Sequence, residues 1–276
     1  MVIIPARYDS TRFPGKPLSL LRGKTLIQHV YENSRGANLI DDIIVATDSE
    51  AIFEKVFSFG GKAVMTSKVH PSGTDRIAEV AASMDCDIVV NVQADEPLIQ
   101  SQMIDDVILL LDDERASIGT LVKKIADLKE IANPNVVKVV FDEEGFALYF
   151  SRSPIPYHRD EWKYINISAV DSQGKEHPLP NPPPSRGREG VGGRLRTPNA
   201  GLLVFKHVGI YSYRREALLA LSKMEPTELE KIEKLEQLRA IEKGMRIKTK
   251  ETFIETYGVD TPEDLERIEK CLSTSL

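Results

Sequence analysis

The sequence MVIIPARYDSTRFPGKP, residues 1–17, joins a short apolar run to a loop that is rich in cations and prolines. The β-branched run Val2–Ile4 predicts a buried strand. In open α/β sheets, ligands bind at the carboxyl ends of the strands, which is where this loop would lie. Arg7, Arg12 and Lys16 could surround a polyphosphate there. The segment therefore predicts the first strand of an α/β sheet with an anion site at its end.

Similar apolar runs recur along the first half of the chain, with helical patterns between them. The predicted strands are Val2–Ile4, Ile43–Ala46, Ala63–Met65, Ile88–Val92 and Ile118–Val122. The predicted helices are Leu20–Ser34, Glu50–Phe59, Thr74–Met84 and Ser101–Leu111. This alternation predicts an α/β fold with a mostly parallel sheet flanked by helices.

The second half of the chain has a different pattern, which predicts a β-rich elaboration of the same single domain, residues 1–276. Val136–Phe141 and Phe146–Phe150 are predicted to form a hairpin. The later predicted elements are a strand at Val208–Tyr213, helices at Arg214–Ser222 and Glu228–Lys243, a strand at Ile247–Glu255 and a helix at Pro262–Cys271.

Residues 177–201 interrupt this pattern, because eleven of these 25 residues are Pro or Gly. Such a composition cannot bury enough apolar surface to offset its ordering entropy. It predicts a flexible insertion. A basic arm is the alternative, since the segment also contains Arg186, Arg188, Arg194 and Arg196.

The overall composition excludes several classes of protein. With 41% hydrophobic and 28% charged residues, the chain is typical of globular proteins. The net charge of −6 argues against nucleic acid as a partner. No apolar run approaches the ~20 residues of a membrane span, and no signal peptide is recognisable, so we expect a cytoplasmic protein without a membrane partner. Cys86 and Cys271 imply neither a disulfide framework nor a zinc site.

The two common phosphate-binding motifs are absent. No GxGxxG follows the first strand, and Gly23-Lys24-Thr25 resembles the end of a P-loop but has Leu18 where that motif requires Gly. If the anion site binds a nucleotide, other residues must therefore hold it.

Two acidic residues follow predicted strands and are candidate Mg²⁺ ligands. Asp95 follows the strand that ends at Val92, and Asp260 follows the strand at Ile247–Glu255. Mg²⁺ is usually bound by one or two carboxylates together with substrate phosphate oxygens. Each residue could instead cap a turn or helix. Their position opposite three cations favours a metal–triphosphate site.

The order of motifs along the chain resembles one family. The motifs are PARYDSTRFPGKP (5–17), HPSGTDR (70–76), NVQADEP (91–97), NPNVVKVV (133–140), YFSRSPIP (149–156), HVGIYSYR (207–214), LEKIEKLEQLR (229–239) and GVDTPEDLE (258–266). They resemble those of the 3-deoxy-manno-octulosonate cytidylyltransferases, or CMP-Kdo synthetases. The resemblance covers nearly the whole chain outside about 163–206.

This resemblance implies a nucleotidyltransferase, Rossmann-like fold and a homodimer that uses CTP, Mg²⁺ and the acidic sugar Kdo in lipopolysaccharide synthesis. It makes Arg7, Lys16, Asp95 and Asp260 the catalytic residues, with the two aspartates as metal ligands. The CTP contacts would be Pro5, Ala6, Arg7, Arg12, Lys16, Ser72, Gly73, Thr74 and Arg76. Arg152 would bind the sugar carboxylate. The sugar hydroxyls would contact Gln93, His207, Tyr211, Glu236 and Gln237. Two features depart from the family: Ala94 stands where Gly is usual, and the 177–201 insertion is foreign.

The residues themselves support part of this assignment. Glu236 follows Ile232 by four positions and Leu229 by seven, so a continuous helix would place it on an apolar face, where a carboxylate needs a partner. Sugar hydroxyls could serve as that partner. A structural ion pair is the alternative for Glu236, and a satisfied core histidine is the alternative for His207.

The implied reaction is an in-line attack of the sugar's anomeric 2-hydroxyl on the α-phosphorus of CTP, which gives CMP-Kdo and pyrophosphate. Positioning and charge neutralisation carry most of such a step, so no general base is assigned. Two alternatives stay open: a cytidylyltransferase for another acidic sugar, or a catalytically inactive nucleotide-binding protein.

Overall fold

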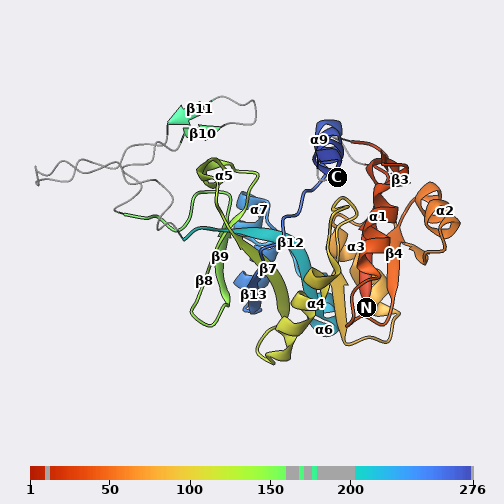
Figure 1. The fold of residues 1–276 in the computed structure, drawn as a ribbon. Coiled ribbons are helices and arrows are strands. Elements are labelled where there is room, and N and C mark those ends of the chain that lie inside the picture. The colour runs from red at the N-terminus through yellow and green to blue at the C-terminus, as the bar shows by residue number, and fades with distance from the viewer. Residues whose placement is uncertain (10–12, 160–167, 171–175, 179–202, 275–276) are drawn as a thin grey trace, which may run out of the picture.

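The computed structural model describes residues 1–9, 13–159, 168–170, 176–178 and 203–274. These residues form a nine-stranded sheet with helices on both faces (Figure 1). The strands of this sheet are β1 (Val2–Ala6), β4 (Ile43–Thr47), β5 (Ala63–Met65), β6 (Ile88–Asn91), β7 (Ile118–Lys124), β8 (Lys138–Phe141), β9 (Ala147–Ser151), β12 (Phe205–Arg214) and β13 (Ile247–Glu251).

The sheet is mostly parallel, as predicted. Its order is β13-β7-β12-β6-β1-β4-β5, and the β8–β9 hairpin joins it at β12. Strand β1 runs parallel to β4 and β6, while β12 runs antiparallel to both β6 and β7. The carboxyl ends of β1 and β6 therefore lie at the same edge, next to the middle of the returning strand β12.

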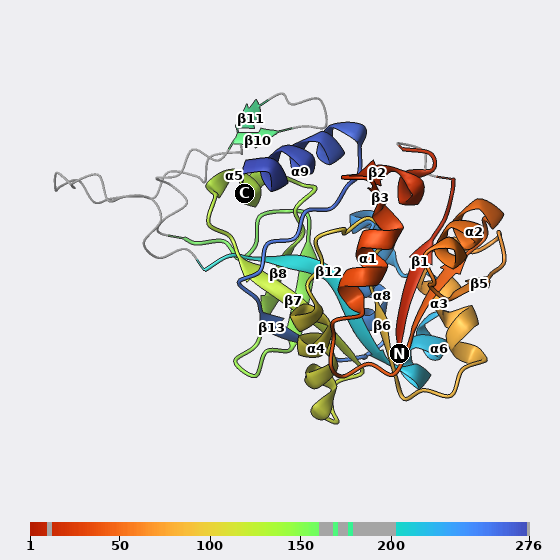
Figure 2. The same ribbon diagram turned by 45° about the vertical axis from the view of Figure 1, so that its right-hand side comes forward.

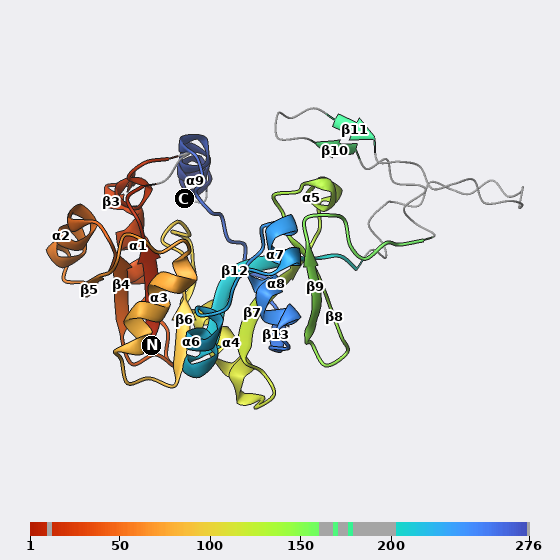
Figure 3. The same ribbon diagram turned by 180° about the vertical axis from the view of Figure 1, so that it is seen from behind.

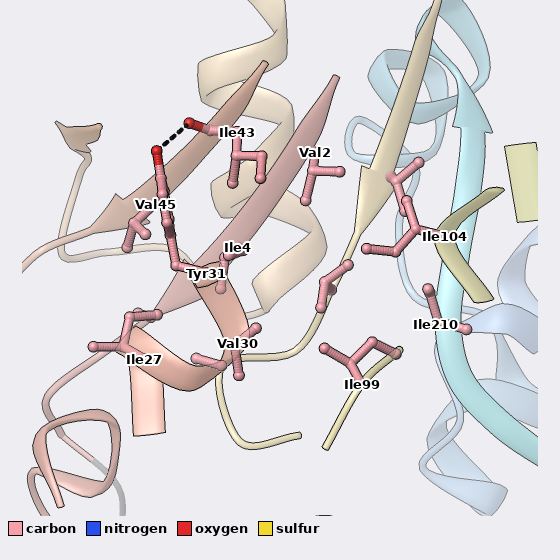
Figure 4. Close-up of a cluster of buried hydrophobic side chains, with 14 of the residues drawn as sticks. Val2, Ile4, Ile27, Val30, Tyr31, Ile43, Val45, Ile99, Ile104 and Ile210 are labelled. Carbon is pink, nitrogen blue, oxygen red and sulfur yellow. Dashed lines mark hydrogen bonds between the residues drawn. The ribbon is translucent and has the colours of Figure 1, made fainter. Parts of the chain in front are cut away.

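The helices cover the two faces because successive residues of a strand point to opposite sides. The helices are α1 (Leu26–Ser34), α2 (Glu50–Ser58), α3 (Gly73–Ala82), α4 (Ser101–Leu109), α5 (Leu128–Ala132), α6 (Arg215–Leu221), α7 (Glu228–Glu233), α8 (Gln237–Glu242) and α9 (Pro262–Thr274). Val2 and Ile4 pack with α1 and α4 (Figure 4) and also with α2. Ile3 packs on the other face with α3, α6 and α8, and Figure 3 shows these three helices on that face.

The predicted helix Leu20–Ser34 is wrong over its first six residues. Strands β2 (Leu20–Leu21) and β3 (Lys24–Thr25) form a small hairpin there, and α1 begins only at Leu26. The two turn residues, Arg22 and Gly23, have φ angles of 49° and 82°. Two consecutive positive φ angles are typical of a tight hairpin turn and incompatible with an α-helix.

The predicted helix Glu228–Lys243 is also interrupted. Helix α7 ends at Glu233 because Lys234 adopts a left-handed conformation, and α8 begins at Gln237. Ile232, which was expected on the apolar face, is 73% exposed. The helical-face argument for Glu236 is therefore wrong: Glu236 lies in the turn between two helices.

The last helix packs against the β2–β3 hairpin (Figure 2). Leu21, Leu26, Val259 and Ile268 form a small buried cluster that ties the two ends of the chain together. No helix in the described ranges is both long and apolar enough to cross a membrane.

Most of the predicted insertion, residues 177–201, lies outside the described residues. Only residues 177–178 are described, within strand β11 (Glu176–Pro178), which pairs with β10 (Ser168–Val170). The flexibility of the segment stays a prediction.

A buried ion pair joins α7 to α8. The Arg239 guanidinium donates to both carboxylate oxygens of Glu230, over 2.7 and 2.6 Å, and to the carbonyl oxygen of Met224 over 3.0 Å. Both side chains are largely buried, and Glu230 also accepts from the backbone N–H of Thr227. This pair fixes the position of the turn that carries Glu236.

We expect Arg239→Met to lower the free energy of unfolding by about 3 kcal/mol, because it leaves a buried carboxylate without its cation. The melting temperature should fall by about 2–4 °C per kcal/mol for a chain of this size. Lys231→Met is the matched control, since Lys231 pairs with Glu228 on the exposed face of α7. The control should change the free energy by less than about 0.5 kcal/mol. Equal losses in both variants would show that the buried pair has no special role.

Candidate functional site

Two cavities adjoin at the carboxyl ends of β1 and β6. The larger, of about 310 Å³, is lined by Arg7, Lys16, Asp95 and Asp260 among others, and we refer to it as the charged cavity. The smaller, of about 200 Å³, is lined by Tyr211 and Tyr213 among others, and we refer to it as the tyrosine cavity. Gly73 and Gln93 line both. A molecule bound in one cavity would therefore lie next to a molecule bound in the other.

The structure brings most of the predicted CTP and metal residues to the charged cavity. Those that line it are Pro5, Ala6, Arg7, Lys16, Ser72, Gly73, Arg76, Asp95 and Asp260. Thr74 lines the tyrosine cavity instead. Arg12 lies outside the described residues. Ala94, which replaces the family's usual Gly, is buried and lines the charged cavity.

The two predicted metal ligands, Asp95 and Asp260, meet at Lys16. The backbone N–H of Val259 donates to the carbonyl oxygen of Asp95 over 2.9 Å, which places Asp260 beside the end of β6. The Lys16 ammonium contacts a carboxylate oxygen of Asp95 and lies 3.4 Å from one of Asp260. Residues 165 positions apart in the sequence thus share one cation.

This donor set fits a hard divalent cation that takes its remaining ligands from a substrate. Within the described part of the chain, no group of three or more His, Cys, Asp or Glu side chains is placed to hold a metal alone. Mg²⁺ typically uses one or two carboxylates and completes its shell with phosphate oxygens and water. The ammonium of Lys16 shows that a positive charge is accommodated between these carboxylates.

Helix α3 begins at the wall of the charged cavity. The Ser72 hydroxyl accepts a hydrogen bond from the backbone N–H of Asp75 and caps the helix. A Cβ atom at Gly73 would lie 3.3 Å from the Pro5 ring. The small residue lets the start of α3 approach the end of β1 closely.

Arg76 lines the charged cavity, and its guanidinium is bonded to residues behind the lining. Its buried guanidinium donates to Asp48 over 2.6 Å, to the Thr66 hydroxyl and to the Ser67 carbonyl oxygen. These bonds hold the loop that precedes α3. The predicted contact between Arg76 and cytidine stays a prediction.

Sequence reasoning missed His70 and Asp48. His70 lines the charged cavity, and its Nε2 atom contacts the Glu79 carboxylate, which lowers the pKa of that carboxyl. His70 is the first residue of the motif HPSGTDR, so its place beside the predicted Ser72 was the available signal. Asp48 carried no signal in the sequence, because its pairing with Arg76 depends on the tertiary fold.

The tyrosine cavity is polar but contains no cation among its described lining residues. Besides the two tyrosines, its polar residues are Thr74, Asn91, Gln93, Glu236 and Gln237. The Gln93 amide donates to the Asn91 side-chain oxygen over 3.1 Å. Hydroxyl and amide groups of this kind suit a ligand that carries several hydroxyls. Asn91 and Tyr213 were missed, although each lies two residues from a predicted site residue. Tyr213 lies on the same side of β12 as Tyr211, and Asn91 is the last residue of β6.

Glu236 enters this cavity from the α7–α8 turn. Its carboxylate accepts a hydrogen bond from the Thr74 hydroxyl. Burial raises the pKa of Glu236 above its usual value of 4.5. Burial therefore makes the charged form of this carboxyl less favourable in the site than in water.

His207 lies behind Tyr211 rather than in either cavity. Its ring contacts Tyr211 and meets Phe150 edge-on, with centroid separations of 5.1 and 5.3 Å. Its Nε2 atom is 3.0 Å from the Thr120 hydroxyl. Burial lowers the pKa of His207 to about 4, so the imidazole is neutral at pH 7. These contacts favour the alternative of a satisfied core histidine that positions Tyr211.

Arg152 also lies outside the lining of both cavities. Its guanidinium donates to the carbonyl oxygens of Glu233 and Pro134, over 2.7 and 2.8 Å. Its backbone N–H donates to the Glu233 carboxylate over 2.9 Å. The fully buried Lys138 donates to the Arg152 carbonyl oxygen. Arg152 is thus bonded to the end of α7. That end of the helix precedes Glu236 and Gln237 by only a few residues.

Glu236→Gln should raise the melting temperature at pH 7.5, because it removes a carboxylate that burial disfavours. With a raised folded-state pKa, the stability contributed by the protonated carboxyl is fully present below about pH 4.5 and is lost as the pH rises through the folded-state pKa. The gain in the variant should therefore vanish near pH 4. Glu228→Gln, at an exposed carboxylate of α7, is the control and should show no such pH-dependent gain. A gain that is equal at both pH values would contradict this account of Glu236.

Comparisons with known proteins agree with this geometry. The family described as Cytidylyltransferase matches residues 1–247. Proteins named 3-deoxy-manno-octulosonate cytidylyltransferase from Geobacter metallireducens and Geotalea uraniireducens are 50% and 51% identical to this chain. The alignments cover 98% and 96% of this chain, and 96% of each relative.

A solved structure of a CMP:2-keto-3-deoxy-manno-octonic acid synthetase complexed with CTP has the same fold. It superimposes with a TM-score of 0.80 at 37% identity and covers 100% of this chain and 98% of that one. The chain belongs to the cytidylyltransferase family and, within it, to the 3-deoxy-manno-octulosonate cytidylyltransferases.

Proposed function

We propose that the protein transfers CMP from CTP to the anomeric 2-hydroxyl of Kdo and releases pyrophosphate. The observation that carries this proposal is the pair of adjoining cavities that share Gly73 and Gln93. One cavity has the charges that a metal–triphosphate requires, and the other has the hydroxyl, amide and carboxyl groups that can hydrogen-bond to a sugar. Family membership supplies the identity of the two substrates.

In the proposed reaction, the sugar oxygen forms a bond to the α-phosphorus of CTP. The bond from that phosphorus to the β-phosphate oxygen breaks, and the hydroxyl proton passes to solvent. Lys16 and the exposed Arg7 line the charged cavity, where they would offset the charge that grows on pyrophosphate. Gln93 lies on the shared wall and would hold the attacking hydroxyl toward the nucleotide.

Asp95 and Asp260 would hold Mg²⁺, which when bound would neutralise phosphate charge and lower the pKa of the attacking hydroxyl. Tyr211, Glu236 and Gln237 would donate to and accept from the sugar hydroxyls. His207 would act through Tyr211. We expect the protein to work as a homodimer in the cytoplasm, and both expectations stay predictions.

The sugar carboxylate needs a cation, and Arg152 is the candidate next to the tyrosine cavity. Backbone carbonyls of residues 134, 233 and 234 engage three of its N–H groups. A guanidinium carries five such groups in a planar fork, so it has the capacity to bind a carboxylate as well. Its attachment to the α7–α8 turn would couple carboxylate binding to the position of Glu236.

The decisive experiment measures pyrophosphate release in the presence of MgCl₂ with CTP and Kdo. Turnover should require both substrates and fall when UTP replaces CTP. Turnover with another acidic ketose but not with Kdo would favour the second candidate, a cytidylyltransferase for a different sugar. CTP binding without turnover on any sugar would favour an inactive nucleotide-binding protein.

Asp95→Asn should reduce kcat by roughly 100-fold or more, because the amide keeps the shape of the carboxylate and loses the charge that faces the cation. Pyrophosphate release under saturating CTP and Kdo measures the effect. Asp42→Asn is the control, since Asp42 pairs with Lys62 away from both cavities and should leave kcat unchanged. Near-normal kcat in Asp95→Asn with an unchanged melting temperature would refute the metal-ligand role.

Arg152→Lys should raise KM for Kdo by roughly tenfold or more, because Lys cannot reproduce the planar fork. KM for CTP should change much less. A Kdo analogue with a carboxamide in place of the carboxylate separates binding from support of the fold. If Arg152 binds the carboxylate, the variant and the parent protein should use this analogue equally poorly. A further loss with the analogue would limit Arg152 to holding the α7–α8 turn.

A further inference from the structure

Lys16 is held firmly between the two acidic side chains. It begins the short 3₁₀ helix η1 (Lys16–Leu18), preceded by Gly15 with a φ of 69°. The backbone N–H of Gly15 donates to the Tyr8 carbonyl oxygen over 2.9 Å, and Pro17 is buried. The side chain of Lys16 is only 13% exposed. The backbone therefore directs the ammonium into the space that Asp95 and Asp260 share.

An ammonium in this position competes with a metal ion. A divalent cation that binds both carboxylates must displace the Lys16 ammonium from Asp95 and approach against its positive charge. The loss of a charge-assisted hydrogen bond opposes this displacement. Metal binding to the free protein should be weakened correspondingly.

A bound triphosphate would remove this obstacle. It brings several negative charges to the charged cavity, which Arg7 also lines. Lysine carries its charge on a flexible four-carbon stem, so the ammonium can turn from a carboxylate to a phosphate while the backbone stays in place. The carboxylates would then be left facing a cation that arrives with the nucleotide.

We propose that Lys16 occupies the cation position between Asp95 and Asp260 in the nucleotide-free protein and excludes divalent metal until a triphosphate draws the ammonium away. Metal and nucleotide would then bind as one event. This inference rests on the proposed function in one respect, because it takes the two aspartates as the metal ligands.

The test is Mn²⁺ binding in the absence of any substrate, followed by the electron paramagnetic resonance signal of free Mn²⁺. We expect Lys16→Met to bind Mn²⁺ roughly tenfold more tightly than the parent protein, which corresponds to about 1.4 kcal/mol. Adding Asp95→Asn to that variant should remove the gain. Lys62→Met is the matched control: it also removes one positive charge from a lysine–aspartate pair, and it should bind Mn²⁺ like the parent protein. Equal affinity in Lys16→Met and the parent would overturn the proposal.

A second measurement tests the role of the triphosphate. Saturating CTP should tighten Mn²⁺ binding by a larger factor in the parent protein than in Lys16→Met, because only the parent has an ammonium to release. The two factors should differ by about the same tenfold, since binding free energies are linked reciprocally. Equal factors would show that the nucleotide does not move Lys16.

Lys16→Gln guards against failure to fold, because its amide can still donate to a carboxylate while it lacks the charge. The melting temperature of either variant should rise with MgCl₂ more than that of the parent protein. Both readouts are independent of CMP transfer. If the parent protein turns over CTP and Kdo but Lys16→Met shows no gain in Mn²⁺ affinity, this inference alone is refuted. If Lys16→Met shows the gain but the parent protein has no turnover, the proposed function alone is refuted.

Discussion

The hydrogen bond from the backbone N–H of Val259 to the carbonyl oxygen of Asp95 joins the segment after β13 to the loop after β6. Together with the contacts of both carboxylates to Lys16, this hydrogen bond fixes the position of the second acidic residue relative to the first. Val259 is itself fully buried, in the cluster that joins α9 to the β2–β3 hairpin. The same small cluster therefore anchors the last helix and helps to set the spacing of the carboxylates. A change in the packing of this cluster would shift Asp260 relative to Asp95 in the charged cavity.

The centre of the sheet could be predicted from the sequence because strands such as β1 and β4 are buried on both faces. Runs such as Val2–Ile4 and Ile43–Ala46 are β-branched, have no polar alternation and alternate with helical patterns, which is typical of a parallel sheet covered on both sides. The two errors in the helices have local causes. The Arg22–Gly23 turn and the left-handed Lys234 end helical geometry within sequences whose residue types are compatible with helix. Backbone conformation at one or two residues decided each boundary.

The charged cavity was predictable to a greater degree than the tyrosine cavity. Arg7, Lys16 and Asp95 follow directly from strand ends, so a strand assignment already places them at one edge of the sheet. The environment of Arg152 and His207 depends on tertiary contacts with Glu233, Phe150 and Thr120, which no spacing in the sequence specifies. The side chains that face a ligand can thus be inferred from motifs more readily than the side chains that hold them in place.

The two cavities draw on different parts of the chain. Apart from Asp260, every described residue that lines the charged cavity precedes residue 96. Half of the tyrosine cavity comes from residues beyond 210, on β12, α6 and the α7–α8 turn. Under the proposed function, substitutions beyond residue 210 would change the sugar-binding side of the tyrosine cavity while leaving every described lining residue of the charged cavity except Asp260 in place.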